Sequence, residues 1–264
     1  MKIKLNKHDL YRLIENFWFA PNDALLRSVE VSIWKNIKFK KPVMEIGVGD
    51  GIMDKFLFKN KIIDVGIDID AKGIINAKNN SLYKKVVFMS AANMNIHNSR
   101  FNTIIANSTF EHIKYDLKAI SEVSRVLKKN GKFIFCVPTD RFAGLLSQNS
   151  KDESEILSYN KRVSQFHYRS LREWTKILKT NGLKIVDYKY YFPENVFKMW
   201  YKLHKLVVLK PYKRELWSYL KDSPLRKFIP ETVVIKLLKI LLLPYYYSIV
   251  SDDGVWIFII SQKT

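Results

Sequence analysis

Short apolar runs alternate with amphipathic segments along most of the chain. Apolar runs of about four to eight residues are typical of buried strands, and apolar positions three or four residues apart are typical of helices. The alternation therefore predicts βαβ units around a parallel sheet that is covered on both faces. We expect strands over Val43–Ile46, Ile62–Ile69, Val86–Met89, Phe101–Ala106, Lys132–Val137, Leu183–Phe192 and Val255–Ile260, and helices over Gly51–Lys59, Ala71–Asn79, Tyr115–Lys129 and Ser170–Asn181.

Turn and capping signals fix several of these boundaries. Ser170 is followed three residues later by Glu173, which is the pattern of a helix capping box. The pair Asn181-Gly182 predicts the end of that helix, and Gly131 is predicted to take the left-handed position just past the preceding helix. Together these elements predict an α/β fold with seven strands in a mostly parallel sheet, helices on both faces, and a helical insertion between the last two strands.

Three segments differ in pattern. Residues 1–41 predict an N-terminal helical segment, residues 42–192 with 254–264 predict the α/β core, and residues 193–253 predict a basic, aromatic helical insertion. A connection of that length is expected to carry structure of its own. A membrane-spanning helix is not expected there, because Lys236, Lys239 and Pro244 interrupt the apolar run. Two interpretations of the insertion stay open: an amphipathic cap on the core, or an interfacial surface that meets lipid.

Composition narrows the class of protein. The hydrophobic content of 47% excludes general disorder. The single cysteine, Cys136, excludes an internal disulfide and is interpreted as a core residue, and no secretory signal is visible, so we expect a cytosolic setting, with the inner face of the membrane as an alternative. The net charge of +20 favours polyanionic partners, including nucleic acid, an anionic membrane surface or phosphorylated substrates.

The segment Val43-Met-Glu-Ile-Gly-Val-Gly-Asp-Gly51 holds the most informative motif. Gly47, Gly49 and Gly51 follow a predicted strand, and glycine there allows a sharp turn and close approach of a ligand to the backbone. The spacing is G-x-G-x-G after an acidic residue, Glu45, and differs from the G-x-G-x-x-G of dinucleotide sites.

Four stretches in order resemble the class I S-adenosylmethionine-dependent methyltransferases, and most closely the type 11 group that includes quinone-biosynthesis C-methyltransferases. They are residues 45–51, residues 65–70 (Val-Gly-Ile-Asp-Ile-Asp), residues 101–113 and residues 122–138. The resemblance covers roughly residues 40–192 and the final strand. It implies a Rossmann-like, seven-stranded, mostly parallel sheet with an antiparallel last strand. It also implies an enzyme that binds S-adenosyl-L-methionine at the carboxyl ends of the strands.

The resemblance also implies which residues bind the cofactor. The glycine loop would hold the methionine and ribose portions, and Asp68, with two acceptor oxygens, would bind the ribose diol. The family commonly has Asp-Ala at the end of the third strand, whereas this chain has Ser90-Ala91, so adenine binding is expected to depend more on backbone groups. The cofactor-binding residues implied in this way are Glu45, Gly47, Gly49, Gly51, Asp68, Ile69, Ser90, Ala91, Asn107 and Ser108.

Two histidines are candidates for a catalytic base. Methyl transfer from a sulfonium needs mainly alignment and exclusion of water, and a base is required only for a weakly acidic hydroxyl or amine. His167 precedes the capping-box helix, on a loop that borders the acceptor pocket in the family, and His112 follows the fourth strand. For both residues a structural role, bonded to nearby backbone, is the alternative. No metal-ligand spacing is visible.

The acceptor is predicted to be a small molecule, a glycan or a lipid-linked compound, because of the resemblance and the apolar insertion. A nucleic-acid methyltransferase is an alternative that the net charge favours, although we find no Asn-Pro-Pro-Tyr-like motif and no Pro-Cys pair. A non-catalytic S-adenosylmethionine-binding scaffold, docked on a membrane or partner, is a third possibility. The sequence leaves open the oligomeric state and whether oxygen, nitrogen or carbon is methylated.

Overall fold

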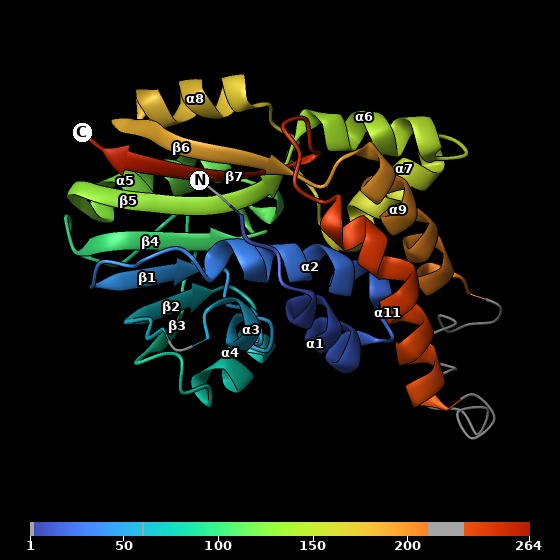
Figure 1. Cartoon of the computed structure of the whole chain (residues 1–264). Coiled ribbons are helices and arrows are strands. Elements are labelled where there is room, and N and C mark those ends of the chain that lie inside the picture. Colours follow the sequence, from blue (N-terminus) through green and yellow to red (C-terminus); the bar gives the residue numbers. More distant parts are fainter. Residues whose placement is uncertain (1–2, 60, 211–229) are drawn as a thin grey trace. The chain divides into compact units, whose positions relative to one another are not determined.

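The computed structural model describes residues 3–59, 61–210 and 230–264 (Figure 1). The chain divides into two compact units. The first, here called the sheet unit, consists of Ile37–Tyr191 and Val255–Thr264. The second, the helical unit, consists of Lys2–Asn36 and Phe192–Gly254. The sequence pattern predicts the N-terminal segment and the insertion as two separate parts, whereas the structure groups them in one unit.

The sheet unit is built on one seven-stranded sheet in the order β3-β2-β1-β4-β5-β7-β6. Neighbouring strands are parallel except around β7, which runs antiparallel to both β5 and β6. This arrangement, visible strand by strand in Figure 1, confirms the predicted fold class. The strands are β1 (Val43–Ile46), β2 (Val65–Asp68), β3 (Val86–Phe88), β4 (Phe101–Asn107), β5 (Leu127–Pro138), β6 (Leu183–Tyr191) and β7 (Trp256–Lys263).

Helices connect these strands, and α5 and α8 pack on one face of the sheet. Their apolar positions are spaced three or four residues apart, so Ile120, Val123 and Trp174 all point into one buried cluster with the strands. Phe135 lies at the centre, with its ring 5.0 Å from that of Trp174. The helices of the unit are α3 (Asp54–Leu57), α4 (Ala71–Lys78), α5 (Asp116–Val126), α6 (Asp140–Asn149), α7 (Glu153–Val163) and α8 (Leu171–Thr180), with a 3₁₀ turn η1 (Phe110–His112).

Two local predictions are confirmed. The capping box at the start of α8 is present, because the Ser170 side chain accepts from the Glu173 backbone and the Glu173 carboxylate accepts from Ser170. The same helix ends at Asn181, and Gly182 follows with a φ of 70°.

Two other local predictions are wrong. The helix expected over Gly51–Lys59 shrinks to one turn, α3, because the residues before it belong to the glycine loop, where Gly51 has a φ of 72°. Gly131 does not take the left-handed position, which falls to Asn130 with a φ of 62°. Glycine is needed at 131 for another reason, since a Cβ there would lie 2.8 Å from the carbonyl oxygen of Lys128.

The helical unit contains α1 (Lys7–Phe17), α2 (Pro21–Trp34), α9 (Glu194–Val208) and α11 (Glu231–Tyr247) among its described residues. The apolar spacing of the insertion correctly predicts α9, in which Phe197, Trp200, Leu203 and Val207 are buried. Part of the predicted insertion, residues 211–229, lies outside the described residues. No helix in the described ranges is both long and apolar enough to cross a membrane.

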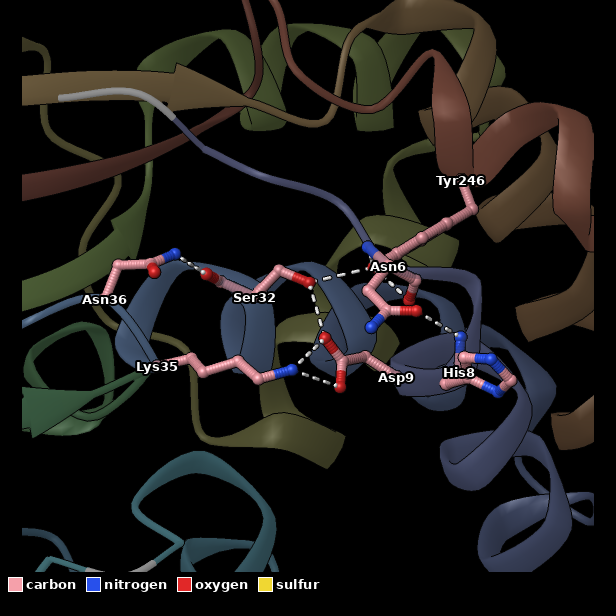
Figure 2. A network of polar contacts seen from close by, with 7 residues as sticks. All are labelled: Asn6, His8, Asp9, Ser32, Lys35, Asn36 and Tyr246. Carbon is pink, nitrogen blue, oxygen red and sulfur yellow. Dashed lines mark hydrogen bonds and ion pairs between the residues drawn. The ribbon is translucent and has the colours of Figure 1, made fainter.

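A buried polar network joins α11 to the N-terminal helices (Figure 2). The Tyr246 hydroxyl lies 2.8 Å from Ser32 Oγ, and Ser32 Oγ donates to Asp9 at 3.1 Å. Lys35 donates to both carboxylate oxygens of Asp9 at 3.0 Å. The Tyr246 hydroxyl also contacts the backbone of Asn6. The network therefore supplies hydrogen-bond partners to buried polar groups of α1, α2 and α11.

Candidate functional site

The carboxyl ends of the central strands meet at one edge of the sheet. Glu45 of β1 is in register with Gly66 of β2 and with Ile105 of β4. The residues that follow each strand therefore leave the sheet side by side. The Gly47 backbone N–H donates to the Ile67 carbonyl at 2.9 Å, which ties the turn after β1 to the end of β2.

A cavity of about 560 Å³ opens at this edge, within the sheet unit. Its walls are mostly apolar, and its volume falls in the range of about 300–1,000 Å³ that is usual for small-molecule sites. Eight residues predicted from the sequence line it: Gly47, Gly49, Asp68, Ile69, Ser90, Ala91, Ser108 and His112. Nine further lining residues escaped the prediction: Ile46, Ile67, Met89, Ala92, Thr109, Ile113, Lys114, Tyr115 and Phe166.

The glycine loop forms one wall, and two of its glycines are required for different reasons. Gly47 has a φ of 85°, and a Cβ there would overlap the Thr109 side chain at 2.3 Å. Gly49 has a φ of 50°, but a Cβ on it would meet nothing within 4 Å. Both positions have the left-handed backbone that favours glycine, and at Gly47 packing against Thr109 excludes a side chain as well. At Gly49 the bare backbone lies beside the cavity.

Asp68 ends β2 and holds the glycine loop in place. Its Oδ2 accepts from the Gly49 N–H at 2.7 Å, and its Oδ1 accepts from the Asp70 N–H at 2.8 Å. Asp70 itself caps α4 by accepting from the Lys72 N–H. The Asp68 carboxylate is therefore both a support of the loop and a charged acceptor in the cavity wall.

Ser90 and Ala91 lie beyond β3 in the same wall. The Ser90 Oγ accepts from the Ala92 N–H at 3.2 Å, which shapes a short turn. Ala91 is buried and Ser90 is exposed. The Ser90 hydroxyl is neutral, so this wall presents backbone groups and apolar surface to the cavity.

Aromatic and basic side chains form the rim of the cavity. Tyr115 and Phe166 line it although they are 60% and 51% exposed, so their rings are available to a ligand. The Lys114 and Lys118 ammonium groups lie 5.7 and 5.6 Å from the centre of the Tyr115 ring. The Phe166 N–H donates to the Glu111 carbonyl at 2.9 Å, which fixes the loop before α8 against the turn after β4.

The two candidate histidines lie in different environments. His112 lines the cavity, and its Nδ1 is 3.3 Å from the Ser164 carbonyl oxygen. His167 is not among the lining residues, and its Nε2 lies 3.1 Å from the carbonyl oxygen of Ile113 and 3.4 Å from Asp116 Oδ1. With oxygen acceptors around Nε2, His167 acts as a hydrogen-bond donor that anchors the loop.

Three other predicted residues also lie outside the cavity lining. Glu45 is buried beneath the glycine loop, and the Gly51 carbonyl accepts from Asn80 Nδ2 at 2.8 Å. The Asn107 side chain accepts from Cys136 Sγ at 3.0 Å, and Cys136 is buried in β5. These residues support the walls of the cavity from behind.

A known protein family matches the part of the chain that forms this cavity. Residues 44–135 match the family model of the type 11 methyltransferase domain. By sequence similarity, residues 44–135 form a methyltransferase domain. The matched residues span β1 to β5 and include the glycine loop, Asp68 and the turn that bears His112.

Similar proteins share the fold of this methyltransferase domain. An uncharacterised protein of Methanocaldococcus jannaschii is 26% identical over 209 residues, which are 79% of this chain and 94% of that protein. A possible histamine N-methyltransferase of Thermotoga maritima superposes with a TM-score of 0.56 at 16% identity, over 97% of this chain and 100% of that one. A putative sarcosine dimethylglycine methyltransferase of Galdieria sulphuraria gives a TM-score of 0.55 at 18% identity, over 92% and 85%.

The residues of the methyltransferase cavity fit S-adenosylmethionine. The open space at Gly49 leaves room for a ligand against the backbone, and Asp68 offers carboxylate oxygens of the kind that bind a ribose diol. Ser90 and Ala91 form another wall, and Ser108 and Thr109 border the cavity at the end of β4. All these groups come from neighbouring strand ends, as expected for a ligand in an open α/β sheet.

A buried acidic cluster under the glycine loop of the methyltransferase domain was not predicted from the sequence. The Tyr83 hydroxyl lies 2.8 Å from Glu45 Oε2 and 2.6 Å from Asp54 Oδ2. Burial, and then the charge of Asp54, raise the pKa of Glu45 well above its usual range. Because the three residues come from β1, α3 and the segment before β3, only the acidic character of Glu45 was visible in the sequence.

This cluster predicts a pH-dependent stability. Folded Glu45 keeps its proton to higher pH than unfolded Glu45, so the free energy of unfolding falls as pH rises from about 4.3 through the raised pKa. The slope approaches about 1.4 kcal/mol per pH unit. Glu45→Gln removes this titration, so its stability relative to the wild type is expected to increase between about pH 5 and pH 8, measured by urea unfolding.

Glu153→Gln is the matched control, because this glutamate is exposed at the start of α7. Its stability relative to the wild type should change little over the same pH range. A constant difference between the wild type and Glu45→Gln across that range would contradict the prediction.

Proposed function

We propose that the chain transfers a methyl group to a small-molecule, sugar or lipid-linked acceptor that enters the cavity past His112, Lys114, Tyr115 and Phe166. The observation that carries this proposal is the exposed aromatic rim on a mostly apolar cavity at the strand ends. Such a rim suits an acceptor with a flat or greasy portion, because aromatic rings offer large contact area at low entropic cost.

The cofactor site is proposed to use the groups on the β1 and β2 ends. Asp68 would bind the ribose, the Gly47 to Gly49 backbone would accommodate the methionine portion, and Ser90 and Ala91 would flank the adenine. When bound there, S-adenosylmethionine supplies a methyl group that its positively charged sulfur has already activated. The protein then has to align the acceptor and exclude water.

His112 is the proposed proton acceptor for a hydroxyl or amine nucleophile. Its Nδ1 faces the Ser164 carbonyl oxygen, which favours the proton on Nδ1 and makes Nε2 the basic nitrogen of the ring. Nε2 lies 3.8 Å from the carboxylate of Glu111, which is buried, so a proton taken up at Nε2 would be stabilised. His167 is proposed to position the rim loop instead.

The test is methyl transfer from labelled S-adenosylmethionine to a panel of phenols, short-chain fatty acids, alkyl glycosides and transfer RNA. Label in an organic-extractable or sugar product is expected. Label confined to RNA would support the alternative acceptor class, and cofactor binding without transfer to any acceptor would favour a binding scaffold. With an active acceptor, His112→Gln should lower kcat by about 10²-fold or more.

His97→Gln is the matched control, because His97 is exposed and does not line the cavity. Activity of this variant should equal that of the wild type. If His112→Gln and His97→Gln were equally active, the proton-acceptor role of His112 would be wrong while the methyl-transfer proposal would stand.

A further inference from the structure

Helix α11 of the helical unit is apolar on two opposite faces. Leu238, Leu242 and Tyr246 are buried, spaced four residues apart. A second row of apolar residues is exposed: Val233 (48%), Leu237 (61%), Ile240 (65%), Leu241 (44%) and Tyr247 (55%), here called the α11 stripe. A surface helix of a water-soluble protein normally carries polar residues on its outward face.

The α11 stripe is continuous. Val233 lies four positions before Leu237, which lies three positions before Ile240. Leu241 is adjacent to Ile240, and Tyr247 follows Ile240 by seven positions. With about 3.6 residues per turn, these spacings place all five residues on one side of the helix. From residue 233 to residue 247 the row is about 21 Å long, which is too short to cross a bilayer core of about 30 Å. A row of this length suits a helix that lies in the plane of a surface, and Tyr247 places an aromatic ring with a polar tip at its end.

Basic side chains accompany the exposed apolar residues. Lys236 is exposed and directly precedes Leu237 of the stripe. Lys239, in contrast, forms an ion pair with Glu15 of the same unit. Lysine and leucine are also combined at exposed positions on α9, where they are Lys202, Lys205 and Leu206. This charge favours an anionic partner, and it disfavours a second copy of a chain whose net charge is already +20.

We propose that the α11 stripe docks on the surface of an anionic lipid membrane, with its apolar side chains in the headgroup region and Lys236 beside them at lipid phosphates. Each apolar residue of the stripe would leave water on docking, and Lys236 would gain an electrostatic attraction. This surface is independent of the methyl-transfer chemistry, because no residue of the stripe lines the cavity.

Vesicle flotation tests the proposal with the full chain. The wild type is expected to bind vesicles of equal phosphatidylglycerol and phosphatidylcholine, and to bind pure phosphatidylcholine vesicles much more weakly. The double variant Leu237→Gln/Ile240→Gln should lose at least about tenfold in partitioning to the anionic vesicles, because two exposed apolar anchors are removed. Its S-adenosylmethionine binding should equal that of the wild type.

The matched control is Ile75→Gln/Leu157→Gln, which replaces two apolar residues of the sheet unit that are 64% and 63% exposed. This variant should bind vesicles as the wild type does. An equal loss in both double variants, or no binding of the wild type to anionic vesicles, would overturn the proposal. So would a wild-type dimer in sedimentation velocity that Leu237→Gln/Ile240→Gln dissociates, since a second copy would then cover the stripe.

Discussion

Asp68→Ala is expected to weaken S-adenosylmethionine binding at least about a hundredfold. The substitution removes the carboxylate that accepts from Gly49 and Asp70 and that faces the cavity. A hydrogen bond to a charged group contributes about 1.5–3 kcal/mol, so losing the loop support and the proposed ribose contacts together gives an effect of this size. Calorimetric titration with S-adenosylmethionine and S-adenosylhomocysteine measures it.

Asp50→Ala is the matched control for this prediction. Asp50 belongs to the same loop, but its carboxylate accepts only from the Ile52 N–H among the hydrogen bonds described for it, and it does not line the cavity. Its affinity for the cofactor should stay within about threefold of the wild type. Equal affinities of the Asp68→Ala and wild-type proteins would remove Asp68 from the cofactor site.

Gly47→Ala is expected to destabilise the protein by about 2–5 kcal/mol. Two costs combine at this position: a left-handed backbone, worth about 1–2 kcal/mol for a non-glycine residue, and overlap with the Thr109 side chain, worth about 1–3 kcal/mol. Urea unfolding of the wild type and the variant gives the difference.

Gly144→Ala provides a control of opposite sign. Gly144 lies inside α6, and a Cβ there would meet nothing within 4 Å. Alanine should therefore stabilise the helix by about 0.5–1 kcal/mol.

Adding Thr109→Ala to Gly47→Ala should relieve part of the overlap but none of the backbone strain. A Gly47→Ala protein as stable as the wild type would show that the loop can rearrange freely.

The strands of the core could be predicted because each one is a short apolar run with polar neighbours. Val43–Ile46 is predicted and observed with identical bounds. The strand expected over Ile62–Ile69 shortens to Val65–Asp68, because residues 65–67 pair with β1 and residues 66–68 pair with β3. The helix expected over Gly51–Lys59 failed because periodicity does not reveal that a glycine loop continues past its last glycine.

Long-range polar contacts set the limit of what the sequence reveals. The hydroxyl of Tyr246 reaches Ser32, 214 positions away, and Tyr83 reaches Glu45 and Asp54. No local pattern encodes such pairs, so the joining of the N-terminal helices with the insertion could not be foreseen.

The candidate site was predictable where a residue directly follows a strand. Gly49, Asp68 and Ser90 follow or end β1, β2 and β3, and all three line the cavity. The sequence predicts His167 as a site residue because an imidazole on a loop can act as a base. In the structure Phe166, the residue before it on the same loop, lines the cavity and His167 does not. Side-chain direction within a loop depends on tertiary contacts, which the sequence does not show.

The strand pairing of β6 and β7 makes the insertion a modular part of the chain. Tyr191, the last residue of β6, is in register with Trp256, the first residue of β7. The intervening segment 192–255 therefore leaves and re-enters the sheet at a single pair of residues, as the loop of an ordinary β-hairpin does. Because the entropy of closing a loop grows only slowly with its length, this junction can accept segments of very different size without altering the strands. Diversity among relatives of this chain should accordingly concentrate at this junction.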